Sequence, residues 1–188
     1  MNSLQDRLSS LAIMIDKTSD WSGRLVSWLT LLMVLLVFLV VVLRYLFEMG
    51  SIPLQESITY LHGMVFLLGA AYTLQQDEHV RVDVFYSSMT PRNRAWVDLG
   101  GTIFLLFPVC LYIFIMSLDY VLLSWRIHES SGEAGGLPGL YLLKSLILIM
   151  PVMMMVQGTA SILRSLLFLF AHRKSPYLKN DHEAVSND

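Results

Sequence analysis

The chain has 188 residues, of which 55% are hydrophobic and only 15% are charged, and its formal net charge is −2. Soluble domains carry about 25% charged residues, so this composition argues against an ordinary soluble domain, and the slightly acidic balance gives no reason to expect nucleic-acid binding. With Cys110 as the single cysteine, an internal disulfide is excluded and no zinc-site spacing exists. Cys110 lies in an apolar run and is interpreted as a small buried hydrophobe.

The first 24 residues are predicted to form an amphipathic helix that lies on the membrane surface. Apolar side chains recur there at helical spacing, at Leu4, Leu8, Leu11 and Ile15. Trp21 suits the headgroup level of a bilayer. An interfacial helix is favoured over the alternative, which is a loose and partly helical leader.

Four long apolar runs follow, each bracketed by charged or polar residues. A helix needs about 20 apolar residues to cross a hydrocarbon core about 30 Å thick, and in lipid the backbone must form its hydrogen bonds within the segment. We therefore predict an all-α integral membrane protein with four transmembrane helices plus the N-terminal interfacial helix. The membrane domain covers residues 25–170, with spans at about 25–46, 55–75, 96–119 and 142–166, and a polar cytoplasmic tail covers 171–188. The first run is longer than a signal-peptide core, so we expect it to be retained.

Prolines and one threonine mark the expected helix starts and bends. Thr90 and Pro91 suit the N-cap and the first position of the third helix, and Pro53 opens the second helix in a similar way. Pro108 and Pro151 lie inside the third and fourth spans. Each removes a backbone hydrogen bond and is expected to bend its helix.

The basic residues near the span ends predict the orientation. Of the 13 lysines and arginines, ten lie in the N-terminal segment, the connection 75–98 and the tail, and three lie in the other two connections. Cytoplasmic loops are enriched in Lys and Arg. Both termini are therefore predicted to be cytoplasmic, with two external connections.

The span interiors offer little chemistry. The apolar runs contain no acidic or basic side chain other than His62, whereas a transporter core usually carries ionisable groups or broken helices at mid-membrane. A lone histidine is interpreted as a hydrogen-bonding group toward a neighbouring helix, and it cannot form a bis-histidine haem site. No nucleophile arrangement, phosphate loop or metal cluster is present in the sequence. We therefore predict a non-enzymatic protein that acts through contacts, without catalytic residues, cofactors or metals.

The second run carries small residues on one helical face and polar residues beside it. The face consists of Thr59, Gly63, Phe66, Ala70 and Thr73, and the polar stripe of Gln55, His62, Gly69 and Gln76. Small residues let helices approach closely in lipid. The pattern fits both packing within the bundle and docking against another membrane protein, and both interpretations are kept.

Short motifs at the span ends have a distinctive order and spacing. They are Arg44-Tyr45 with Phe47, the segment 50–57 with Glu56, Gly69-Ala70-Ala71 followed by His79 to Asp83, and Ser124-Trp125, Glu129-Ser130 and Gly136-Leu137-Pro138. Together, over roughly residues 25–167, they resemble the small membrane subunit (DctQ-type) of the tripartite ATP-independent periplasmic (TRAP) transporters.

The resemblance implies a machine with three components in the bacterial inner membrane. A periplasmic substrate-binding protein would capture the substrate, commonly an organic acid. A large multi-span membrane subunit would carry it by an elevator-like movement driven by a sodium gradient. The small subunit would be non-catalytic, would brace the large one within the lipid bilayer, and would help to dock the binding protein.

The candidate partner contacts combine the motif residues with the small face of the second run. They are Arg44, Glu56, Gly63, Ala70, His79, Arg81, Asp83, Trp125 and Glu129. Two alternatives to the subunit interpretation are a self-sufficient small oligomeric transporter or channel, and a membrane enzyme or cytochrome. The lack of charged residues inside the spans disfavours the first, and the lack of a second histidine at matching depth disfavours a cytochrome.

Overall fold

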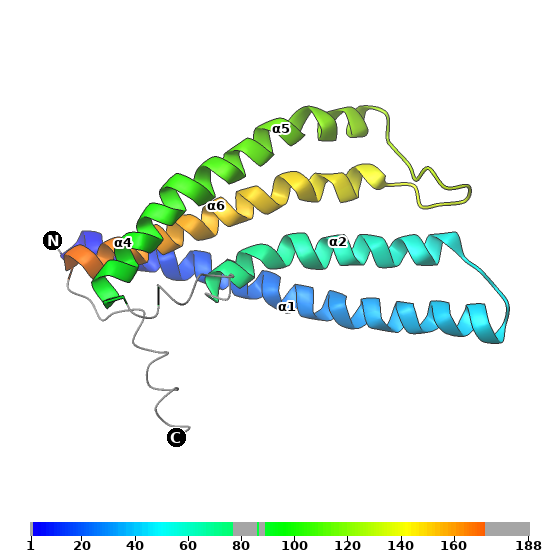
Figure 1. Cartoon of the computed structure of the whole chain (residues 1–188), viewed down its shortest axis with the longest axis horizontal. Helices are drawn as coiled ribbons and strands as arrows, with labels where there is room; N and C mark the ends of the chain where they lie inside the picture. Colours follow the sequence, from blue (N-terminus) through cyan, green and yellow to red (C-terminus); the bar gives the residue numbers. More distant parts are fainter. Residues whose placement is uncertain (1, 77–85, 87–88, 172–188) are drawn as a thin grey trace, which may run out of the picture.

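The computed structural model describes residues 2–76, 86 and 89–171 (Figure 1). Its helices are α1 (Asn2–Leu46), α2 (Ile52–Gln75), α4 (Pro91–Gly101), η1 (Thr102–Leu106), α5 (Phe107–Arg126) and α6 (Leu140–Ala171). Within the described residues, four helical segments are long and apolar enough to cross a membrane, and α4, η1 and α5 together form one of them. The prediction of an all-α protein with four membrane helices is confirmed.

The predicted N-terminal leader and the first span form one uninterrupted helix. α1 has 45 residues, which corresponds to a length of about 68 Å at 1.5 Å per residue, so part of it must lie outside a hydrocarbon core of about 30 Å. Ala12, Ser19 and Ser22 of its first half are buried, whereas Leu11 and Trp21 are exposed. The helical prediction for the leader is confirmed, and its location at the membrane surface stays a prediction.

The helices form an open row toward one end of the molecule. We call this the hairpin end, because the connections 47–51 and 127–139 lie there, and the opposite end the terminal end. Figure 1 shows α1, α2, α6 and α5 in that order at the hairpin end, and each helix packs on the next. α6 also contacts α1 and α4, and these contacts close the arrangement at the terminal end. Each helix of the row therefore leaves a face uncovered by its neighbours.

The third span begins and bends as its residues predict. The Thr90 side chain caps α4 by accepting a hydrogen bond from the Asn93 N–H over 3.4 Å. Further along, the N–H of Phe107 donates to the carbonyl of Thr102, which makes η1 a π-helical turn. This turn lies directly before Pro108, whose missing N–H leaves a preceding carbonyl without its usual partner. The helix curves through this region in Figure 1.

Close packing holds α6 against the other helices. A Cβ atom on Gly158 would lie 2.7 Å from Leu106 Cδ2 and 2.9 Å from Phe107 Cε1, so the glycine lets α6 approach the π-helical turn without displacing these side chains. α6 continues through Pro151, which is fully buried.

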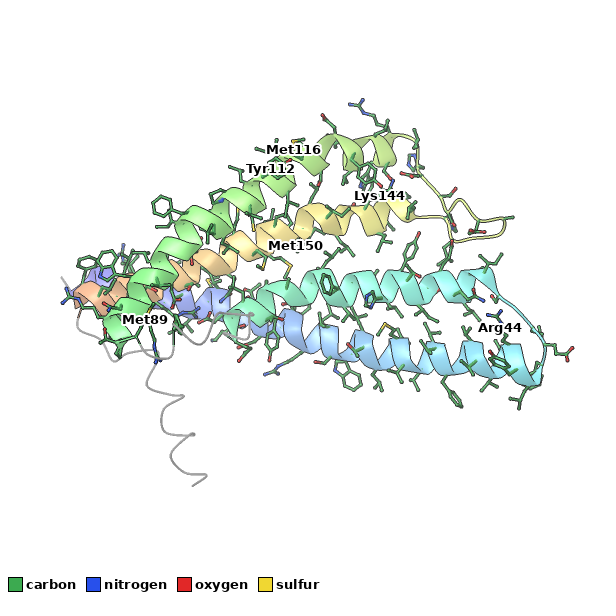
Figure 2. The ribbon with its side chains drawn as sticks, in the orientation of Figure 1. Arg44, Met89, Tyr112, Met116, Lys144 and Met150 are labelled. Carbon is green, nitrogen blue, oxygen red and sulfur yellow. The ribbon has the colours of Figure 1, made fainter. Side chains whose placement is uncertain are left out.

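A small cluster of buried side chains forms the middle of the core. Ala71, Cys110 and Met154 lie at its centre, so Cys110 is a small buried hydrophobe, as predicted. Met150 packs against this cluster and lies between α6 and α2 in Figure 2.

Candidate functional site

One carboxylate fastens the α5–α6 connection to the start of α2. Glu56 accepts hydrogen bonds from the Ser131 hydroxyl and from the backbone N–H of Leu137, the latter over 2.6 Å. The N–H of Ser131 donates to the carbonyl of Leu137 over 3.1 Å, which closes the connection into a hairpin. A Cβ atom on Gly136 would lie 2.5 Å from Ser131 Oγ and 2.8 Å from Glu56 Oε2. The position must therefore be glycine for the carboxylate to reach the loop.

Trp125 joins the last turn of α5 to the first turns of α6. Its indole N–H donates to Ser145 Oγ over 2.8 Å, and its ring meets the ring of Tyr141 edge to face, with the centroids 4.8 Å apart. Such aromatic pairs stabilise a contact by about 0.5–1.5 kcal/mol beyond the area they bury. Trp125 remains partly open to the surroundings, with 44% of the residue exposed.

An ion pair lies next to Trp125. Lys144 Nζ is 2.5 Å from Glu129 Oε2 and 4.0 Å from the centroid of the Tyr120 ring. The side chains of Lys144 and Glu129 are 12% and 27% exposed, and Lys144 lies between α5 and α6 in Figure 2. The hydrogen bond from Lys144 holds the pKa of Glu129 below its usual value. The ammonium group thus binds a carboxylate and an aromatic face together.

The structure brings three predicted contact residues, Glu56, Trp125 and Glu129, to the hairpin end. Arg44 also lies at this end (Figure 2) and is exposed. With Gln55 it lines a shallow hollow at the α1–α2 turn. His79, Arg81 and Asp83 lie outside the described residues.

The small residues of α2 divide between two environments. A Cβ atom on Gly63 would be 2.9 Å from Leu143 Cδ1 of α6, and Ala70 packs against the buried cluster. Thr59 and Phe66, predicted on the same face, are exposed. Gly63 and Ala70 therefore pack within the chain, and any contact with a partner stays a prediction.

Sequence reasoning missed a polar network at the terminal end. Gln157 of α6 is fully buried; its Oε1 accepts from Ser19 Oγ over 2.7 Å, and its Nε2 donates to Asp16 Oδ1 over 3.1 Å. Arg164 Nη1 donates to both oxygens of Asp16, over 2.7 and 2.8 Å. The opposite charges of Asp16 and Arg164 are visible in the sequence, but no local spacing links residues of the first and fourth helices.

The matching family is the DctQ component of the tripartite ATP-independent periplasmic transporters, and the match covers residues 33–168. The chain belongs to this family. It is therefore a small membrane subunit of the TRAP type, and the resemblance drawn from the span-end motifs is confirmed. The matched range contains Glu56, Trp125 and Glu129 with all of their polar contacts described above.

A relative gives the same assignment over a shorter stretch. Over 84 residues the chain is 34% identical to a protein of Haemophilus influenzae that is named as a TRAP transporter small permease protein. That stretch is 45% of this chain and 51% of the relative, so the chain spans about half the length of the curated relative that it matches. No solved structure matches the chain.

Proposed function

We propose that this TRAP subunit is non-catalytic and braces a large multi-span membrane subunit. We also propose that it helps to dock a periplasmic substrate-binding protein. The complex would take up an organic acid, and a sodium gradient would drive the uptake. The membrane is the bacterial inner membrane, and both termini are cytoplasmic.

The observation that carries the bracing role is the open row of helices. α5 packs on α6 at the hairpin end and leaves large apolar side chains uncovered, including Tyr112 at 65% and Met116 at 63% exposure (Figure 2). An open row offers more lateral surface than a closed bundle of the same four helices. Such a surface suits a subunit that stabilises a neighbour by helix packing in lipid.

The fastened α5–α6 hairpin supports the docking role. With cytoplasmic termini, the connections 47–51 and 127–139 face the periplasm. Glu56 holds the longer connection through two hydrogen bonds to Ser131 and Leu137. A loop that is already ordered loses less conformational entropy when a protein binds to it, so the hairpin is a suitable platform for a soluble partner.

Co-purification tests this function. The full chain, tagged at its C-terminus, is extracted in mild detergent from cells of its native host. We expect a large multi-span subunit to co-purify in stoichiometric amount, and liposomes with this chain alone to show no solute flux. A homo-oligomer that lacks such a partner and supports flux by itself would overturn the proposal in favour of a self-sufficient transporter.

A further inference from the structure

α2 presents a line of exposed residues at regular helical spacing. After its first residue, α2 exposes Gln55, Thr59, His62 and Phe66. Counted from Gln55 as position i, these residues are at i, i+4, i+7 and i+11. We call these four residues the α2 stripe. Residues at such intervals lie on one face of a helix and can meet a second helix along its length. Three of the four side chains are polar, in a helix that crosses the membrane.

The exposed line of α6 has a different character. Its residues are Leu142, Ile149, Val152, Val156, Thr159, Leu166 and Phe170. Thr159 is the polar member, and its hydroxyl donates to the carbonyl of Met155 within the same helix over 2.9 Å. The α6 line is therefore compatible with acyl chains along its whole length, whereas the α2 stripe is not.

His62 lies deep in the membrane by its position in α2. The helix has 24 residues, or about 36 Å, which is only slightly longer than a hydrocarbon core of about 30 Å. His62 is ten residues after Ile52, so it lies about 15 Å from the start of the helix. At any modest tilt, the imidazole is near the middle of the hydrocarbon core.

The imidazole of His62 has no hydrogen-bond partner among the described residues. Its ring contact is a stack on Phe66, with centroids 6.4 Å apart and an interplanar angle of 24°, and Phe66 itself is 71% exposed. A neutral imidazole has one donor and one acceptor nitrogen. Leaving both unpaired in hydrocarbon is costly, and acyl chains cannot pair them.

We propose that the α2 stripe is the docking line for a membrane-spanning helix of the large subunit, and that this helix carries a hydrogen-bonding side chain opposite His62. The proposal rests on the proposed function, which supplies the partner. The stripe offers an amide, a hydroxyl and an imidazole along one line, with Phe66 as an apolar side chain at its end, so a partner helix would be recognised by polar groups at matching positions. The line also continues toward the hairpin end, where Gln55 and Arg44 line the same hollow.

Photo-crosslinking within the co-expressed complex identifies the occupant. Benzoylphenylalanine replaces Phe66 on the stripe or, as a matched control, Val156 on the exposed line of α6. We expect the probe at position 66 to capture the large subunit and the probe at 156 to capture lipid. Capture of a second copy of this chain at position 66, or of lipid alone, would overturn the proposal.

Substitution then tests the hydrogen bond. His62→Leu is expected to lower the amount of co-purified large subunit by about three- to tenfold, in line with an interhelical hydrogen bond in lipid, and His62→Gln is expected to retain most of it. Thr159→Val removes the polar group from the exposed line of α6 and is expected to leave the amount of co-purified large subunit unchanged. An unchanged complex with His62→Leu would overturn the inference while the proposed function stands. A wild-type chain that captures no large subunit would overturn both.

Discussion

The carboxylate of Glu56 accepts a hydrogen bond from the backbone N–H of Leu137 over 2.6 Å, although 81 residues separate the two in the chain. This bond links the start of α2 to the end of the α5–α6 connection. The two helical hairpins of the chain are thereby joined at one end by a side chain. At the other end they are joined by Asp16 and Arg164, so the open row is fastened at both ends.

Glu56→Gln should loosen the α5–α6 connection. The glutamine amide keeps one acceptor oxygen but presents an NH₂ group where the carboxylate receives two donors. We expect faster hydrogen exchange at the Leu137 amide and faster protease cleavage in residues 130–138, with unchanged helix content. Glu133→Gln, at an exposed position of the same connection, is the control and should exchange like the wild type. Equal exchange at Leu137 in both variants would contradict the fastening role.

Gly136→Ala should reproduce the effect of Glu56→Gln from the other side of the contact. The added methyl group would lie 2.5 Å from Ser131 Oγ and 2.8 Å from Glu56 Oε2, so the loop must move away from the carboxylate. Gly132→Ala in the same connection meets no atom within 4 Å and is the matched control. Hydrogen exchange of the double variant Glu56→Gln/Gly136→Ala should equal that of either single variant, because both substitutions remove the same contact between Glu56 and the loop. Additive effects on the exchange rate would contradict this account.

The membrane helices could be predicted because lipid imposes a strong rule. Every backbone group in the hydrocarbon core needs a partner within its own helix, so length and apolarity alone predict four helices. The capping role of Thr90 was likewise predictable, because it depends on the next three residues.

The tertiary contacts could not be predicted in the same way. Asp16 and Arg164 pair across 148 residues, and Gln157 looks in the sequence like one polar residue near the end of an apolar run. The second span illustrates the same limit. Its small face divides between the internal Gly63 and the exposed Thr59, because the open row of helices covers only part of α2.

Gln157→Leu should destabilise the terminal end. The buried hydroxyl of Ser19 would lose its acceptor, and Asp16 would lose a donor. An unsatisfied buried polar group costs about 1–3 kcal/mol, and this loss should appear in the free energy of unfolding in detergent micelles. Gln76→Leu, at an exposed position, should change that free energy by less than about 0.5 kcal/mol. A stability for Gln157→Leu equal to that of the control would show that the network contributes nothing.

The stabilisation from the Lys144–Glu129 ion pair should be lost at acidic pH and should not vary with pH near neutrality. The hydrogen bond from Lys144 lowers the pKa of Glu129 from its usual value of 4.5. The stabilisation that the ionised Glu129 contributes to the folded protein is therefore fully present above pH 4.5. It is lost as the pH falls below that value through the folded-state pKa. Melting temperatures measured across this range should fall less steeply for Glu129→Gln than for the wild type. Parallel curves for the two proteins would exclude a contribution from this pair.

Gly158→Ala should separate α6 from the π-helical turn of the third span. Its Cβ atom would lie 2.7 Å from Leu106 Cδ2, 2.9 Å from Phe107 Cε1 and 3.2 Å from Thr102 Cγ2. Three side chains surround the position and would have to shift to admit the added methyl group, and such overpacking costs about 1–3 kcal/mol.

Gly100→Ala introduces the same methyl group but is expected to stabilise the protein. Gly100 lies inside α4, and a Cβ atom there meets nothing within 4 Å. Alanine is favoured over glycine in a helix interior by about 0.8–1 kcal/mol, so this variant should be more stable than the wild type. Measured in the same detergent, the free energy of unfolding should be lower than that of the wild type for Gly158→Ala and higher for Gly100→Ala. If both substitutions stabilise the protein, α6 does not approach η1 as closely as described, and the bend at Pro108 must be held by other contacts.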